Sequence, residues 1–131
     1  MPSGTSQLSP DVERFLREHV DSVEQSEMIV AMYNKSDQWW TAHELAAELY
    51  LSDVPTARDL ETLARRGFLE VLVKNELHYR MAPVSQALTL GVQDLAGLYR
   101  TRRVDILSYV VRKKGRPLKH FADAFRFRKG D

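Results

Sequence analysis

The residue types that most often carry catalysis or hold a metal ion are few in this sequence, and their spacing suits neither task. The four histidines, His19, His43, His78 and His120, lie far apart, and no His-Glu-x-x-His pattern brings two of them to one zinc ion. The chain has no cysteine, which excludes thiol catalysis, disulfides and Cys-ligated zinc. A glycine-rich phosphate loop and the Gly-x-Ser-x-Gly of serine hydrolases are absent as well. We therefore expect a protein that is not an enzyme and that uses no metal or cofactor.

The charged residues divide the chain into an acidic part and a basic part. Residues 1–83 carry 14 Asp and Glu against 8 Lys and Arg, whereas residues 84–131 carry 4 against 11, and the formal net charge of the whole chain is +1. Such an asymmetry is informative about charged partners and says little about the fold.

The apolar residues are distributed as in an ordinary globular protein. They make up 44% of the chain, and no apolar run approaches the roughly 18–20 residues of a membrane span. The first ten residues lack the hydrophobic region of a signal peptide, and the absence of cysteine fits a reducing compartment. We expect a cytoplasmic protein that does not bind a membrane.

The first half of the chain is predicted to contain four helices. Each starts near a residue that can cap a helix, and one of these starts is a capping box of Thr and Glu three residues apart. The four begin at Ser9, Asp21, Thr41 and about Val54, and the last one stops at Gly67.

After Gly67 the apolar residues change from a helical period to alternation. Residues 68–73 and 77–81 are expected to form two strands around a turn at 74–76. Leu77, Tyr79 and Met81 alternate with polar residues, which predicts one buried and one solvated face. The predicted fold class is therefore mainly α with a small β-hairpin, preceded by a disordered N-terminus at residues 1–8.

Two groups of residues within these elements follow a recognisable pattern. The first is Thr41, Glu44, Leu45, Ala46 and Leu49, followed by Thr56, Ala57, Arg58, Leu60, Leu63, Gly67, Phe68 and Leu69, and the second is Trp39-Trp40 with Phe121 to Arg126. With the first group, the chain resembles over about residues 22–82 the winged helix-turn-helix of bacterial MarR-, PadR- and GntR-type regulators. With the second, it resembles an uncharacterised group of bacterial winged-helix proteins that end in Phe-Ala-Asp-Ala-Phe-Arg. The resemblance implies a winged-helix domain over residues 9–83 and a DNA-binding transcriptional regulator.

In such a fold the second helix of the motif enters the major groove and the hairpin reaches the neighbouring backbone. If Ala57, Leu60 and Leu63 face inward, the polar side chains of this helix are available to bases and phosphates. The residues expected to contact DNA are Thr56, Arg58, Thr62 and Arg65 on the helix, and Lys74, Asn75 and Arg80 on the hairpin.

The charge of the motif argues against this role. Residues 53–66 hold three acidic and three basic side chains, whereas DNA-binding surfaces are usually basic because phosphate neutralisation supplies most non-specific affinity. The alternative function is a winged-helix adaptor that binds another protein and not DNA. Duplex DNA is the partner that we favour.

Residues 84–131 are expected to form a helical dimerisation segment with a basic tail. The pattern from Ser85 to about Lys114 predicts one long helix, with a break near Gly91 as the alternative. A helix of this length would span about 42 Å, so its apolar stripe needs a second surface. That surface is either a second copy in a homodimer, which we favour, or the N-terminal helix of the same chain. The stripe consists of Leu88, Val92, Leu95, Tyr99, Ile106 and Val110.

Two further features are candidate sites for a partner or for the tail. Trp39-Trp40 either caps the core beside the motif, which is the commoner case, or lines a partner site. The chain ends in a short amphipathic segment whose apolar face holds Leu118, Phe121 and Phe125. This tail docks on the acidic body of the chain, or its basic residues contact phosphates, and a membrane surface is the weakest of the three alternatives.

Overall fold

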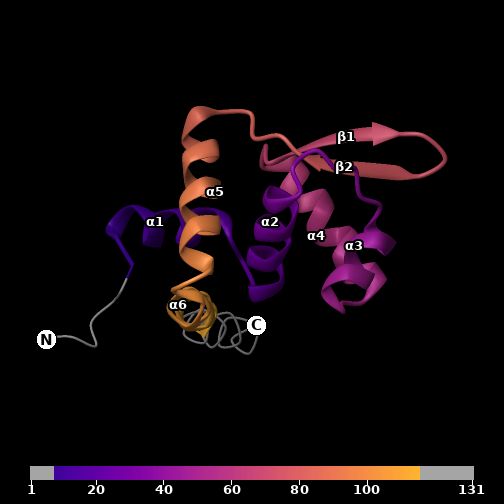
Figure 1. Ribbon diagram of the computed structural model, residues 1–131. Coiled ribbons are helices and arrows are strands. Elements are labelled where there is room, and N and C mark those ends of the chain that lie inside the picture. Colours follow the sequence, from indigo (N-terminus) through magenta and orange to yellow (C-terminus); the bar gives the residue numbers. More distant parts are fainter. Residues whose placement is uncertain (1–7, 116–131) are drawn as a thin grey trace, which may run out of the picture.

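Helices dominate the part of the chain that the structure describes. The computed structural model describes residues 8–115. The expected architecture, mainly α with a small antiparallel hairpin after the fourth helix, is confirmed (Figure 1). In chain order the described elements are α1 (Pro10–His19), α2 (Val23–Asn34), α3 (Ala42–Leu49), α4 (Asp53–Arg65), β1 (Leu69–Val73), β2 (Leu77–Met81), α5 (Gln86–Tyr99) and α6 (Arg103–Gly115).

Side-chain caps mark the start of α1, α2, α3 and α5, whereas α4 begins after Ser52 without one. Thr41 starts α3 with a complete capping box: its Oγ1 accepts a hydrogen bond from the Glu44 N–H at 3.1 Å, and Glu44 Oε1 accepts one from the Thr41 N–H at 2.9 Å. The expected start of the second helix at Asp21 is wrong by one residue, because Ser22 is the N-cap and accepts from the Gln25 N–H at 3.1 Å. Each cap satisfies a backbone N–H that has no partner within the helix, and each contributes about 1 kcal/mol.

Each strand of the hairpin has a contact or a turn that holds it against the helices. β1 and β2 pair antiparallel, with Leu69 opposite Met81. Trp40 forms an isolated bridge with Tyr79, and their two N–H···O hydrogen bonds are both 2.8 Å long. Gly67 has a φ of 92° and turns the chain from α4 into β1, a conformation that favours glycine. The segment before α3 and the end of α4 therefore hold the hairpin in place.

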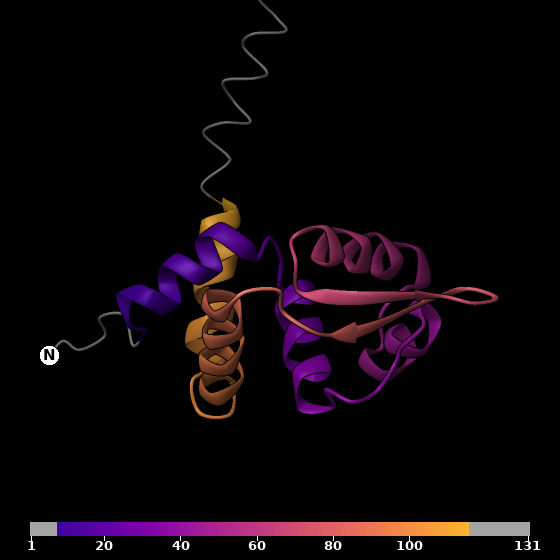
Figure 2. The same cartoon turned by 90° about the horizontal axis from the view of Figure 1, so that it is seen from above.

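The elements form two groups that share one core. α3, α4 and the hairpin lie on one side of α2, and α1, α5 and α6 lie on the other (Figures 1 and 2). The hairpin extends beyond the helices (Figure 2). Fully buried side chains from both groups fill the interior, among them Leu16, Ile29, Leu60, Phe68 and Leu95.

The C-terminal stripe does not lie on one long helix. α5 ends at Tyr99 and α6 starts at Arg103, so the single helix expected from Ser85 to Lys114 is wrong, and so is the alternative break near Gly91. The turn is held against α2: the Tyr99 hydroxyl donates to Glu27 at 2.9 Å, and the Arg103 guanidinium donates to the same carboxylate at 2.7 Å. Burial raises the pKa of Tyr99, so the phenol remains a donor at neutral pH.

Folding back places the stripe inside one chain. Leu88, Val92, Leu95, Ile106 and Val110 are buried, and Tyr99 is half-buried. α5 and α6 pack on α1 and α2, and Lys113 Nζ donates to the carbonyl oxygens of Leu16 and Val20 at the end of α1. Packing on the chain's own helices, the second of the two interpretations, therefore accounts for these six side chains. They form no exposed seam for a second copy.

Residues 8–115 contain no helix whose length and apolar character would let it cross a bilayer. The tail positions Leu118, Phe121 and Phe125 lie outside the described residues.

Candidate nucleic-acid interface

Helix α4 has one buried row of side chains and one exposed face. Thr56, Leu60 and Leu63 form the buried row, and Thr56 is only 1% exposed. Ala57 is exposed instead. The expectations that Ala57 faces inward and that Thr56 faces a ligand are therefore wrong. Positions 56 and 57 are four and three residues before Leu60, so helical spacing permits either one to share its face, and only packing selects Thr56.

The exposed face of α4 carries one arginine without an ion pair. Arg58 is exposed and forms no ion pair with any residue of the described part. Arg65 is also exposed, but it lies 3.3 Å from Glu61 and donates to the hydroxyl of Thr62, which is half-buried, at 3.5 Å. An exposed pair of this kind is worth little energy, so Arg65 can exchange Glu61 for another anion.

The hairpin presents its polar residues at two different places. Lys74 and Asn75 are exposed at the tip, where the Lys74 N–H donates to the carbonyl oxygen of Glu76 at 3.1 Å. Arg80 lies at the base, pairs with Glu70 at 2.7 Å and stacks on Trp39 with its guanidinium carbon 4.4 Å from the ring centre. Arg80 is therefore already engaged within the hairpin, whereas the tip is open.

The remaining charges around α4 are engaged with neighbouring elements. Asp53 at the start of α4 bonds His43 Nδ1 at 2.8 Å, and this hydrogen bond raises the pKa of His43. Asp59 accepts from the Gln25 amide at 3.0 Å. Arg66 donates to Asp21 at 2.7 Å and to the carbonyl oxygen of His19 at 2.8 Å. These contacts fix both ends of α4. Arg58 on α4 and Lys74 at the hairpin tip are exposed cations without an ion pair in the described part, and Arg65 has only an exposed one.

Two separate sets of exposed apolar side chains, one before α4 and one on the hairpin, were not predicted from the sequence. Tyr50 is 94% exposed in the turn before α4, and Val54 in the first turn is 62% exposed. On the hairpin, Val71, Val73 and Leu77 are exposed although they share a face with buried residues nearer the base. Leu77 was expected to be buried. The alternation predicted the face correctly, but the far half of the hairpin extends beyond the core.

The two tryptophans have separate roles. Trp40 is 2% exposed and belongs to the core, as expected for a pair that caps it. Trp39 is half-buried under Arg80.

Residues 8–115 bring no three His, Asp or Glu side chains together in a way that could hold a metal ion. No protein-family model, no curated protein sequence and no solved structure matches the chain.

Proposed function

We propose that the protein binds duplex DNA through a winged helix-turn-helix made of α3, α4 and the hairpin, and that it is a homodimeric transcriptional regulator. The observation that carries the proposal is the open outer face of α4. Arg58, Glu61 and Arg65 are exposed in the described part. The opposite row of the same helix, Thr56, Leu60 and Leu63, is buried in the core.

This arrangement suits a groove-binding helix. α4 is 13 residues long, about 20 Å at 1.5 Å per residue, and a helix fits the major groove. Arg58 lies in the second turn, where a guanidinium can donate to two acceptors of guanine. Lys74 and Asn75 at the hairpin tip are free to contact phosphates.

Selection of duplexes from a random pool by the full-length protein tests the proposal. We expect an enriched sequence whose affinity falls steeply with salt. Arg58→Ala should weaken binding about tenfold or more and relax the preference at one base pair, because a bidentate arginine contributes about 1–3 kcal/mol of discrimination. Lys74→Ala should weaken all sequences alike and reduce the salt slope by about 1.

Arg100→Ala is the matched control, because Arg100 is an exposed arginine in the turn after α5, far from α4 in the chain. It should bind the enriched duplex like the wild type. If no sequence is enriched at low salt, or if Arg58→Ala and Arg100→Ala bind alike, the proposed DNA interface is wrong.

The exposed apolar side chains before α4 and on the hairpin favour a second candidate function, a winged-helix adaptor that binds another protein. Tyr50, Val54 and Val73 would then supply the apolar centre of the interface, and the balanced charges of α4 would form its rim. The same selection distinguishes the two functions, since the adaptor predicts no enriched duplex at any salt concentration.

A further inference from the structure

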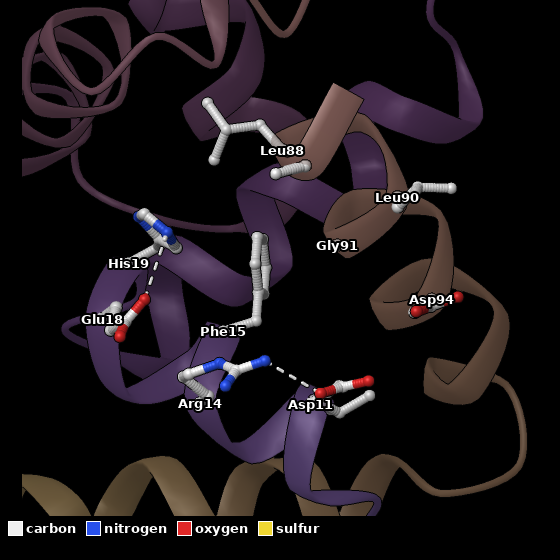
Figure 3. A pocket seen from close by; sticks show the side chains of 11 residues that line it. Asp11, Arg14, Phe15, Glu18, His19, Leu88, Leu90, Gly91 and Asp94 are labelled. Atoms are coloured by element: carbon white, nitrogen blue, oxygen red, sulfur yellow. Dashed lines mark hydrogen bonds and ion pairs between the residues drawn. The ribbon is translucent and has the colours of Figure 1, made fainter. Parts of the chain in front are cut away.

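A groove of about 320 Å³ lies between α1 and the first half of α5. Figure 3 shows Phe15 at its centre, with Leu88 and Leu90 from α5 on one side and charged side chains around the opening. This volume is at the lower end of the range of small-molecule sites. The groove is separate from the exposed face of α4.

Gly91 makes the close approach of the two helices possible. A Cβ atom added at Gly91 would overlap two carbons of the Phe15 ring. Phe15 therefore rests directly on the backbone of α5, and the groove opens beside this contact. A glycine within a helix costs about 1 kcal/mol relative to alanine, so its presence here is explained by the packing of Phe15.

The opening of the groove is acidic. Asp11, Glu18 and Asp94 supply three carboxylates, and Arg14 supplies one guanidinium, which pairs with Asp11 at 2.9 Å. Asp94 forms no ion pair with the described residues. Burial of its ring lowers the pKa of His19, which disfavours its charged form, and its Nε2 lies 3.9 Å from a carboxylate oxygen of Glu18. An apolar floor under an excess of carboxylates favours a ligand with a positive charge on an apolar body.

We propose that the groove between α1 and α5 binds a small organic cation, an ammonium or guanidinium group carried on an aromatic or alkyl body. The apolar body lies against Phe15 and Leu90, and the cation is held by the carboxylate of Asp94, which lies four residues after Leu90 on the same helix.

The walls of the groove lead to the junction of α4 and the hairpin. The Phe68 ring, at the start of β1, lies 6.0 Å from the Phe15 ring and 5.8 Å from the His19 ring, measured between centroids. Leu88 is packed against Gly67. A ligand on Phe15 therefore contacts the ring that packs on Phe68, next to the end of α4. Any effect on DNA binding rests on the proposed function, but binding of the cation itself does not.

Three probes of similar shape test the charge requirement on the full-length protein: 2-phenylethylammonium, 2-phenylethanol and phenylacetate. Backbone amide NMR shifts are followed during titration to millimolar concentrations. We expect 2-phenylethylammonium to shift the amides of Phe15, Leu88 and Asp94 in a saturable way, 2-phenylethanol to bind more weakly, and phenylacetate to bind least.

A pair of isosteric variants tests the assignment of the carboxylate. Asp94→Asn should weaken binding of 2-phenylethylammonium about fivefold, the upper effect of one exposed charge pair. Asp37→Asn is the control, since Asp37 is an exposed carboxylate in the loop after α2. It should leave the dissociation constant unchanged. The proposal is overturned if the three probes shift the groove amides equally, if none shifts them, or if both variants bind like the wild type.

Discussion

The glycines of this chain show how one residue type has opposite effects at different positions. Gly67 has a φ of 92°, and a Cβ atom there would lie 2.7 Å from a methyl carbon of Val84. Gly97 lies in α5 with no atom within 4 Å of the corresponding position. The first glycine is required by backbone and packing together, whereas the second only weakens its helix.

This contrast gives a prediction at the residue scale. Gly67→Ala should lower the free energy of unfolding by roughly 1–2 kcal/mol, because an L-residue is strained at this φ and the methyl group meets Val84. Gly97→Ala should raise it by about 0.5–1 kcal/mol through helix propensity. Urea unfolding of both variants measures the difference, and equal effects would show that Gly67 does not need its left-handed conformation.

The arginines show that residue type alone does not predict which side chains are free to bind DNA. Arg58, Arg65 and Arg80 were all expected to contact DNA, yet their surroundings differ. Arg58 has no ion pair among the described residues, Arg65 has an exposed one, and Arg80 is held by Glu70 and Trp39. A guanidinium that already contacts a carboxylate and an aromatic ring, as in Arg80, is less available to DNA. Substitution of Arg58 therefore tests the proposed DNA interface most directly.

At the scale of elements, the turn between α5 and α6 decides the architecture of the C-terminal part. Leu98 accepts hydrogen bonds from the N–H groups of Thr101 and Arg102, and Arg102 in turn accepts from the N–H of Ile106 in the first turn of α6. Glu27 of α2 binds the side chains on both sides of this turn. The chain changes direction there, and α6 packs on α1 (Figure 1).

Paired substitutions on α6 test this reversal. Ile106→Ala should destabilise the protein by about 2–4 kcal/mol, because Ile106 is fully buried within the chain and its removal leaves a cavity. Val104→Ala should change stability by less than about 0.5 kcal/mol, because Val104 is 75% exposed. Urea unfolding at several protein concentrations provides the measurement. If Ile106→Ala lowered the free energy of unfolding only at high protein concentration, a second copy would cover this residue.

At the scale of the whole molecule, the homodimer is still a prediction, and its interface must lie outside the buried stripe. On the outer side of α6, Val104 and Val111 are exposed and are seven residues apart, so they share one face of the helix. We therefore expect a second copy to pack on this face of α6. The exposed hairpin residues lie in the other group of elements.

Sedimentation velocity tests the assignment. We expect the wild type to be a dimer at micromolar concentrations, and the double variant V104E/V111E to be a monomer, because two carboxylates would be desolvated in the interface. V73E alters an equally exposed residue on the hairpin and should stay dimeric. A wild type that is monomeric throughout, or a dimer lost only in V73E, would contradict an α6 interface.

Local features of the fold could be predicted from the sequence because they depend on neighbours in the chain. The capping box at Thr41, the stop at Gly67 and the alternation of the hairpin each arise from contacts within a few residues, and the structure has all three. These features place α4 and the hairpin, and with them most of the candidate interface.

Which surface covers an apolar residue was decided only by the tertiary structure. Helical spacing made Thr56 and Ala57 equivalent, and it left the stripe from Leu88 to Val110 without an identified partner. The groove at Gly91 likewise exists only because α1 and α5 meet there. The physical reason is that a periodic pattern predicts which side chains are buried but not what they pack against. The element that covers them is set by packing between segments that are distant in the chain.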